Sequence, residues 1–347
     1  MKKCFIWVMA AVACLGMTAC GGAKEKTVSG NETSGNGEGG FAKQSIKVSY
    51  AGTSQGIDGI AFEKWAELVA EKTDGAVTLD GYGDCQLSGG DMDRMVELLV
   101  QGGAYDLCIL SEGVMEGING EFYALEVPFA FNGYDDVYAH VDSEKGQAWL
   151  KEEFSDTGLT YLATLPNGIS QLTNAKHEVY EPSDLKDLLI RVYGDSDFRL
   201  IKALGADAVP MSFSELYSAL QQGTVDGQIN GLQTISSANL QEVQKYVTML
   251  NMTWSGYHMV ANSKAWSGYS EELRKVLEET SVEAAGYARS HLAETEEKLR
   301  GEFEEAGVVF CDLSEEQLEK FKELALPVAE ETISTLSENT IEVWELK

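Results

Sequence analysis

The pattern that most restricts the fold is an alternation of strand-like and helix-like segments that begins near residue 46. Residues 46–50 alternate in polarity as a strand does, and residues 76–82 and the apolar stretch 106–110 read in the same way. The intervening residues 62–69 and 92–100 carry apolar side chains at helical spacing. Strand, helix, strand, helix and strand in about sixty-five residues predict a parallel or mixed sheet with helices on its faces.

The second half of the chain repeats the alternation. Residues 159–165 and 188–192 read as strands, and residues 198–204 read as a helix. Ser212 and Glu215 have the spacing of a capping box, which predicts the start of a further helix that ends near Gly223. We therefore expect a second α/β unit, and a chain of 347 residues is long enough for two.

One predicted helix is too long for a single α/β unit. The segment 271–306 contains no proline, and Gly286 and Gly301 are its only glycines. It corresponds to about ten turns of helix. We expect this helix to connect two lobes.

The N-terminus has the pattern of a secretory signal. Lys2 and Lys3 precede an apolar run over residues 4–15, which is too short to span a bilayer comfortably. Residues 17–21 read MTACG and resemble the lipobox of bacterial lipoproteins, so we expect a lipoprotein signal peptide over residues 1–19 and lipidation at Cys20. A plain signal peptide with a chance cysteine is the alternative. Residues 20–43 are rich in Gly, Ser, Asn and charged side chains, which predicts a flexible tether.

The charge of the chain excludes several classes of partner. The net charge is −30, and removal of the two lysines in residues 1–19 changes it to −32. Such a surface repels nucleic acid and lacks a polybasic face for membrane binding. Because it also repels small anions, a site for an anion would need its own buried positive charge.

The sequence shows no signature of a metal, cofactor or catalytic site. The cysteines that would remain after processing, Cys85, Cys108 and Cys311, have no C-x-x-C spacing. The four histidines form no H-x-x-x-H pair, and no G-x-S-x-G motif occurs. We therefore expect neither a bound metal nor a cofactor, and we expect that the chain is not an enzyme.

A dense set of short motifs lies between residues 188 and 246. They are LIRV (189–192), ALGA (203–206), VPM (209–211), FSELY (213–217), VDGQ (225–228), Asn230 and EVQKY (242–246). With these motifs the sequence resembles the solute-binding proteins of tripartite ATP-independent periplasmic (TRAP) transporters, the DctP family. The resemblance continues in the segments around residues 83–84, 106–107, 127–129 and 167–174, and it covers residues 45 to about 335.

The resemblance implies an α/β periplasmic-binding-protein-like fold of the type II clam-shell kind, with two lobes, hinge strands and a long interlobe helix. We expect the first lobe to comprise residues 44–167 and 256–295, and the second to comprise residues 168–255 and 296–347. The implied function is the capture of a small organic acid, a sugar acid or another carboxylate, outside the cytoplasm. The implied partners are the small and large TRAP membrane subunits. A binding protein for another importer or for a sensor, with a neutral sugar or polyol as ligand, is the alternative.

The resemblance also implies ligand contacts. The family's arginine that pairs with a ligand carboxylate corresponds to Arg191, and a guanidinium offers a planar fork that matches a carboxylate. Asn230 corresponds to a residue that hydrogen-bonds the ligand, and Phe213 to a ring on the cleft wall. The alternatives are a salt bridge or a packing role for Arg191, a turn-stabilising role for Asn230 and a core position for Phe213.

Further candidates follow predicted strands at one sheet edge, where α/β proteins place ligand loops. These are Tyr50, Thr53, Ser111 and Glu112, and each can equally be a plain loop residue. Many relatives carry a second arginine at the position of Ser170. Its loss removes a positive group, which favours a monocarboxylate rich in hydroxyls over a dicarboxylate, while a neutral sugar or polyol stays possible.

Overall fold

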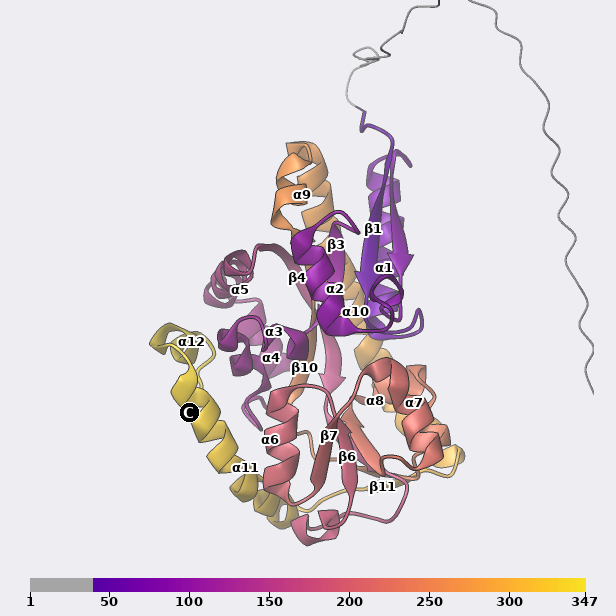
Figure 1. Cartoon of the computed structure of the whole chain (residues 1–347), viewed down its shortest axis with the longest axis vertical. Coiled ribbons are helices and arrows are strands. Elements are labelled where there is room, and N and C mark those ends of the chain that lie inside the picture. The colour runs from indigo at the N-terminus through magenta and orange to yellow at the C-terminus, as the bar shows by residue number, and fades with distance from the viewer. Residues whose placement is uncertain (1–39) are drawn as a thin grey trace, which may run out of the picture. The chain divides into compact units, whose positions relative to one another are not determined.

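The computed structural model describes residues 40–347. The predicted signal peptide (1–19), Cys20 and most of the predicted tether (20–43) therefore lie outside the described residues. Residues 40–347 form two β-sheets with helices packed around them (Figure 1). Within this part of the chain, no helix combines the length and the apolar character that a membrane span requires.

The first sheet has five strands in the order β2-β1-β3-β10-β4. Its strands are β1 (Gln44–Tyr50), β2 (Val77–Tyr82), β3 (Leu107–Ser111), β4 (Leu159–Ile169) and β10 (Trp254–Asn262). β1 pairs in parallel with both β2 and β3, as the predicted crossovers require, whereas β10 is antiparallel to β3 and β4. The helices of this lobe are α1 (Ile57–Lys72), α2 (Met92–Gln101), α3 (Glu112–Met115), α4 (Tyr134–Val141), α5 (Glu144–Asp156) and α9 (Ser263–Gly268), with 3₁₀ turns η1 (Gln86–Ser88) and η2 (Gly120–Glu126). The alternating strands and helices predicted for residues 46–110 are confirmed.

The second sheet has six strands in the order β11-β9-β5-β8-β6-β7. Its strands are β5 (Gln171–Asn174), β6 (Leu189–Val192), β7 (Asp207–Pro210), β8 (Gly227–Asn230), β9 (Tyr246–Thr248) and β11 (Val309–Cys311). Its shorter helices and turns are α6 (Asp195–Leu204), α7 (Phe213–Gln222), α8 (Leu232–Ser237), η3 (Pro182–Leu185) and η4 (Leu240–Glu242). Two separate apolar clusters lie against it, one including Leu200 and Phe321 and the other Leu216 and Phe303. The predicted α/β architecture of two lobes is confirmed.

Two strand connections cross from one sheet to the other at the same place. β4 continues into β5 through Ser170, and β9 leads into β10 through residues 249–253. The two crossings hydrogen-bond each other, since the Ser170 amide donates to the Thr253 carbonyl (2.8 Å) and the Met252 amide donates to the Ser170 carbonyl (3.1 Å). The Phe129 amide, in the segment between η2 and α4, also donates to the Met252 carbonyl (2.7 Å). These crossings form the hinge.

The long helix α10 (Glu271–Glu305) contains 35 residues and begins at Ser270, whose hydroxyl accepts from the Leu273 amide. It packs against α1 and β4 in the first lobe and against α8 and β11 in the second. Its buried Leu277 and Leu292 belong to the core of the first lobe, whereas Phe303 belongs to a core of the second. The prediction of a helix that spans both lobes is confirmed.

The end of the chain differs from the predicted division into lobes. Helix α11 (Glu315–Thr335) packs on α6 in the second lobe, but α12 (Glu338–Val343) packs on α5 in the first. Trp344 is buried edge-on against Trp149 at 5.1 Å between ring centroids, and the Trp149 indole N–H donates to Thr340 (2.8 Å). The last residues are thus part of the core of the first lobe.

The capping box predicted at the start of α7 was wrong. Ser212 is the N-cap, but its side chain makes no cap hydrogen bond. The Glu215 amide donates to the Ser212 backbone carbonyl instead (3.2 Å). Because the Glu215 amide is already bonded to a backbone carbonyl, it is not available as a donor to the Ser212 hydroxyl.

Candidate ligand-binding site

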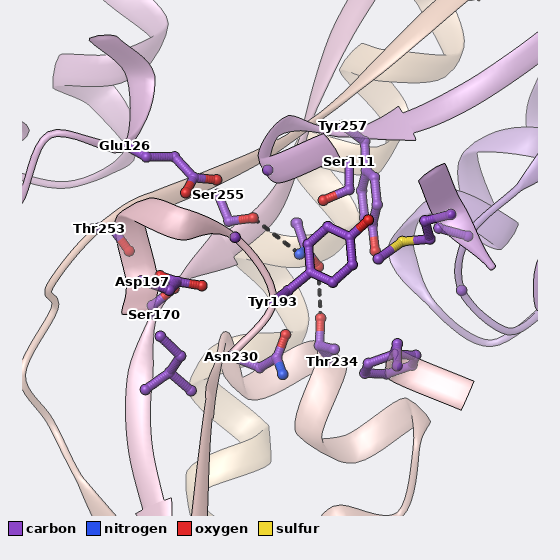
Figure 2. A pocket seen from close by; sticks show the side chains of 18 of the residues that line it. Ser111, Glu126, Ser170, Tyr193, Asp197, Asn230, Thr234, Thr253, Ser255 and Tyr257 are labelled. Carbon is purple, nitrogen blue, oxygen red and sulfur yellow. Dashed lines mark hydrogen bonds between the residues drawn. The ribbon is translucent and has the colours of Figure 1, made fainter. Parts of the chain in front are cut away.

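A cavity lies between the two lobes, close to the hinge. Its empty volume is about 630 Å³ including its solvent-open part, which is the size of a small-molecule site. The first lobe and the hinge contribute Ser111, Glu126, Asn167, Ser170, Ser255 and Tyr257 to its wall. The second lobe contributes Arg191, Tyr193, Asp197, Phe213, Asn230 and Thr234. Figure 2 shows hydroxyl, amide and carboxyl groups from both lobes around this space, so the wall suits a small polar molecule.

Arg191 supplies the positive charge that the sequence analysis required. It is the third residue of β6, pairs with Val209 and Gln228 on the neighbouring strands, and is only 3% exposed. Its Nε donates to the Met211 carbonyl (2.9 Å), whereas its Nη2 has no hydrogen-bond partner within residues 40–347. Because a buried N–H without a partner is costly, this nitrogen is available to an anion that enters the cavity.

Aromatic rings and burial define the surroundings of the guanidinium. Its central carbon lies 5.9 Å from the centroid of the Tyr193 ring and 6.0 Å from that of Phe213. Burial lowers the pKa of Arg191 to about 10, with Asp197 acting in the opposite direction. Arg191 therefore remains charged at neutral pH in a site poorly supplied with water, where its attraction for a carboxylate is stronger than in bulk solvent.

Asn230 ends β8 and is held by a buried chain of hydrogen bonds. Its amide donates to the Gln228 side chain, Gln228 donates to Thr173 (3.0 Å), and Thr173 donates to Gln244 (2.8 Å). One amide hydrogen of Asn230 is used in this chain, so its oxygen and second N–H are free to bind a ligand. The side chain thus has a fixed orientation before any ligand arrives.

The remaining predicted contacts divide into two groups. Ser170, Ser111 and Phe213 line the cavity together with Arg191 and Asn230. Tyr50, Thr53 and Glu112 do not form part of its wall. The strand-end rule correctly selects the sheet edge, but it does not give the direction in which each side chain points.

Each of the three residues outside the wall has other contacts. Tyr50 stacks on Phe62 (5.3 Å between centroids), and the Thr53 hydroxyl accepts from the Gln55 amide (3.2 Å). Glu112 is fully buried and hydrogen-bonds His258. The ligand-binding roles assigned to all eight residues from the sequence remain predictions.

The sequence analysis missed a polar network that joins three elements of the wall. The Thr234 hydroxyl of α8 donates to the Asn167 oxygen (2.7 Å), and the Asn167 amide donates to Ser255 of β10 (3.1 Å) (Figure 2). Asn167 entered the sequence analysis only as part of a family motif. Thr234 and Ser255 carry no local signal, because hydroxyl side chains are common on any surface.

Two carboxyl groups also line the cavity and were missed. Glu126 ends η2 in the first lobe, and Asp197 lies on the first turn of α6 in the second. Burial raises the pKa of Asp197 to about 6, although Arg191 acts to lower it. Burial, followed by the nearby Glu116 carboxyl, raises the pKa of Glu126 well above its usual range. In a chain with 56 acidic residues, no sequence pattern distinguishes these two.

Hydrogen bonds across the cleft show that the lobes are closed. The Tyr193 hydroxyl donates to Asp93 (3.2 Å), and the Ser214 hydroxyl donates to the Gly90 carbonyl (3.1 Å). The Ser196 hydroxyl donates to the buried carboxylate of Glu116. Each of these bonds joins the second lobe to the first, so opening the cleft would break them.

The described residues offer no site for a metal ion. No group of three or more His, Cys, Asp or Glu side chains within residues 40–347 is arranged to hold one. Cys85, Cys108 and Cys311 are free thiols and are buried.

Comparison with known proteins agrees with this geometry. Residues 48–335 match the family model DctP, bacterial extracellular solute-binding protein, family 7. The chain is 32% identical over 277 residues to the 2,3-diketo-L-gulonate-binding periplasmic protein YiaO of Escherichia coli, covering 79% of this chain and 83% of that protein.

Solved structures of similar proteins have the same fold. The sugar acid-binding protein of Advenella mimigardefordensis in complex with galactonate has a TM-score of 0.83 and 26% identity, and the match covers 88% of this chain and 98% of that one. A TRAP periplasmic solute-binding protein from Sulfurospirillum deleyianum with bound succinate has a TM-score of 0.81 and 25% identity, over 88% and 100% of the two chains. The predicted two-lobe periplasmic-binding-protein fold is confirmed, and the chain belongs to the DctP family of TRAP transporter solute-binding proteins.

Proposed function

We propose that the protein captures a small organic acid outside the cytoplasm, holds its carboxylate on Arg191 and delivers it to TRAP membrane subunits. The observation that carries the proposal is the buried guanidinium whose Nη2 has no partner within residues 40–347 and which lies on the wall of a cavity between closed lobes. An anion is the natural partner of such a group.

We propose further that the ligand carries a single carboxylate. The similar proteins from Advenella and Sulfurospirillum were solved with galactonate and succinate, so family membership alone does not fix the number of carboxylates. By the family resemblance, Ser170 corresponds to a position that carries a second arginine in many relatives. Arg191 is the only cationic side chain on the cavity wall of the described residues. A hydroxylated monocarboxylate, such as a sugar acid, matches one guanidinium and many neutral polar groups.

A thermal-shift experiment tests the proposal. We expect hydroxylated monocarboxylates such as galactonate to raise the melting temperature, because ligand binding stabilises the closed form by mass action. Arg191→Ala should lose this stabilisation. Arg274→Ala is the matched control, since it removes the same charge from α10 outside the cavity wall and should keep the response. Stabilisation by neutral sugars alone, undiminished in Arg191→Ala, would refute the carboxylate role and favour a sugar-binding function.

Delivery and anchoring need separate tests. Purified protein should return its ligand chemically unchanged after denaturation, as mass spectrometry can establish, whereas a turnover product would reveal an enzyme. Transport by reconstituted TRAP membrane subunits should depend on adding the loaded protein. Cys20→Ala should move the protein from the membrane fraction to the soluble fraction if Cys20 carries the lipid anchor.

A further inference from the structure

The cavity wall carries more acidic side chains than basic ones. One guanidinium, Arg191, faces the space together with two carboxyl groups, Glu126 and Asp197. The two acids come from opposite lobes, and Figure 2 shows both among the groups around the cavity. Closure therefore places two carboxyl groups around any ligand that a single cation holds.

Arg191 does not neutralise these acids directly. Among the ion pairs of residues 40–347 none joins Arg191 to Asp197 or to Glu126, so Asp197 acts on the guanidinium only through the electric field. Glu126 reaches towards the second lobe beside Gly113. A Cβ built on Gly113 would lie 3.3 Å from the Tyr193 ring and 3.6 Å from Glu126 Oε1. Glu126 is hydrogen-bonded to the Glu116 carboxyl and Asp197 accepts from the Tyr193 backbone amide, but a carboxyl group has two oxygens, so each acid can accept a further hydrogen bond from a ligand.

We propose that Glu126 and Asp197 are specificity-determining residues, which accept hydrogen bonds from ligand hydroxyl groups and reject a second carboxylate. The inference rests on the proposed function, because it takes the ligand carboxylate to lie on Arg191. A ligand hydroxyl can donate to the Asp197 carboxylate in a charge-assisted bond, or to an oxygen of Glu126. A second carboxylate has no proton to donate, meets the negative charge of Asp197, and finds the Glu126 carboxyl already hydrogen-bonded to Glu116. Neutral groups such as Ser111, Ser255 and Thr234 complete a wall suited to a hydroxylated chain.

Two matched ligand pairs test the proposal by calorimetry at pH 7.5. Galactonate and galactarate differ only in a terminal CH₂OH or carboxylate, as do 4-hydroxybutanoate and succinate. We expect the wild type to bind the hydroxylated member of each pair on the order of 100-fold more tightly, which corresponds to a like-charge cost of about 3 kcal/mol. In the double variant Glu126→Gln and Asp197→Asn, the preference should fall below about tenfold through a gain in affinity for the dicarboxylate.

The control variant is Asp195→Asn, which removes an acid from the same turn of α6. Asp195 is exposed and pairs with Arg199 (3.0 Å), and it does not line the cavity, so its loss should leave both ratios unchanged. A gain in dicarboxylate binding cannot arise from misfolding. The inference is overturned if the wild type binds both members of a pair equally, or if the double variant keeps the wild-type ratios.

The pH dependence of the wild type provides a second measurement. The titratable and charged groups around the two acids are Glu112, Glu116, Tyr123, Arg191, Tyr193 and Arg199. Burial raises the pKa of Asp197 to about 6, so this group is ionised at pH 7.5 and largely protonated at pH 5. Succinate affinity relative to 4-hydroxybutanoate should rise more steeply with falling pH in the wild type than in Asp197→Asn, which corrects for the protonation of succinate itself, and equal slopes would contradict the inference.

The two proposals fail in different ways. Unimpaired binding of every acid by Arg191→Ala refutes the proposed function and the inference with it. Loss of binding in Arg191→Ala, combined with equal binding of monocarboxylates and dicarboxylates by the wild type, refutes only the role of Glu126 and Asp197. If neither the wild type nor any variant binds any of the four acids, both the proposed function and the inference are refuted.

Discussion

The two lobes contribute to the cavity in different ways. The second lobe presents Arg191 and Asn230 from the ends of adjacent parallel strands, and buried partners fix both side chains before a ligand arrives. The first lobe contributes Ser111 and Tyr257, which are register partners on β3 and β10, and Glu126 from the end of η2, but no positive charge. Because the second lobe carries the only cation on the cavity wall of the described residues, we expect it to bind the ligand first and the first lobe then to close over it, which would shift the population towards the closed form.

The largest difference between the lobes should appear when one wall residue is removed from each. Arg191→Ala should weaken binding of the acid roughly 100-fold or more, since loss of one partner from a buried charge pair costs about 3–5 kcal/mol. Ser111→Ala removes one neutral hydroxyl from the first lobe and should weaken binding less than about tenfold. Calorimetry measures both, and equal losses would end the distinction between the lobes.

A smaller effect is expected at Asn230. If Asn230 contacts a charged ligand as predicted, Asn230→Ala should reduce the affinity by about 10- to 100-fold, corresponding to about 1.5–3 kcal/mol. Gln222→Ala removes an exposed amide from the end of α7 in the same lobe and serves as the control. An Asn230→Ala variant with wild-type affinity would limit the role of the second lobe to Arg191.

The contribution of closure can be separated from that of ligand contact. Tyr193→Phe keeps the ring beside Arg191 but removes the hydroxyl that donates to Asp93 across the cleft. We expect affinity to fall by about 2- to 10-fold, because one hydrogen bond contributes about 0.5–1.5 kcal/mol. The loss should be absent in an Asp93→Ala background, which lacks the acceptor, if this bond is its cause, and a double-mutant cycle measures that coupling.

The smallest expected effect is a fractional proton uptake on binding. Burial raises the pKa of both Asp58 in the first lobe and Asp197 in the second to about 6. Asp58 accepts from the Gly52 and Gly59 amides and is not itself on the cavity wall, whereas Asp197 lies on the wall and feels the charge of Arg191. A ligand carboxylate on Arg191 offsets that positive charge, so it should raise the pKa of Asp197 further.

Proton uptake should therefore accompany binding near pH 6–7. Calorimetry in buffers of different ionisation enthalpy measures the number of protons taken up. Asp197→Asn should abolish the uptake and Asp58→Asn should preserve it. Proton release on binding would contradict the predicted rise in the pKa of Asp197. An uptake that is lost in Asp58→Asn would show that the titrating group lies in the first lobe instead.

Local patterns were sufficient to predict several parts of the molecule. The absence of proline from residues 271–306 predicted α10, because an uninterrupted apolar stripe of that length has few alternatives to a helix. Arg191 and Asn230 were found through their motifs. Both belong to short strands whose side-chain direction follows from pairing with their neighbours.

Other features depend on contacts between residues far apart in the chain. The direction of Glu112 follows from His258, 146 residues away, which draws its carboxylate into the core of the first lobe. Asp197 gains its role only when closure brings Glu116 and Glu126 near it. The packing of Trp344 on Trp149 could not be foreseen either, since an amphipathic C-terminal helix can pack on either lobe. Sequence patterns predict the secondary-structure elements, whereas the environment of each of these side chains depends on contacts between distant residues.

The hydrogen bonds between the two hinge connections affect how ligand binding is coupled to lobe closure. Because Ser170 and Thr253 are joined through their backbones, the two connections must twist together, which favours rotation about one axis over sliding of one lobe past the other. Both residues also lie on the cavity wall. A ligand in the cavity would contact the hinge residues directly. Ligand binding and lobe rotation can therefore be coupled at the hinge, without contacts elsewhere in the fold.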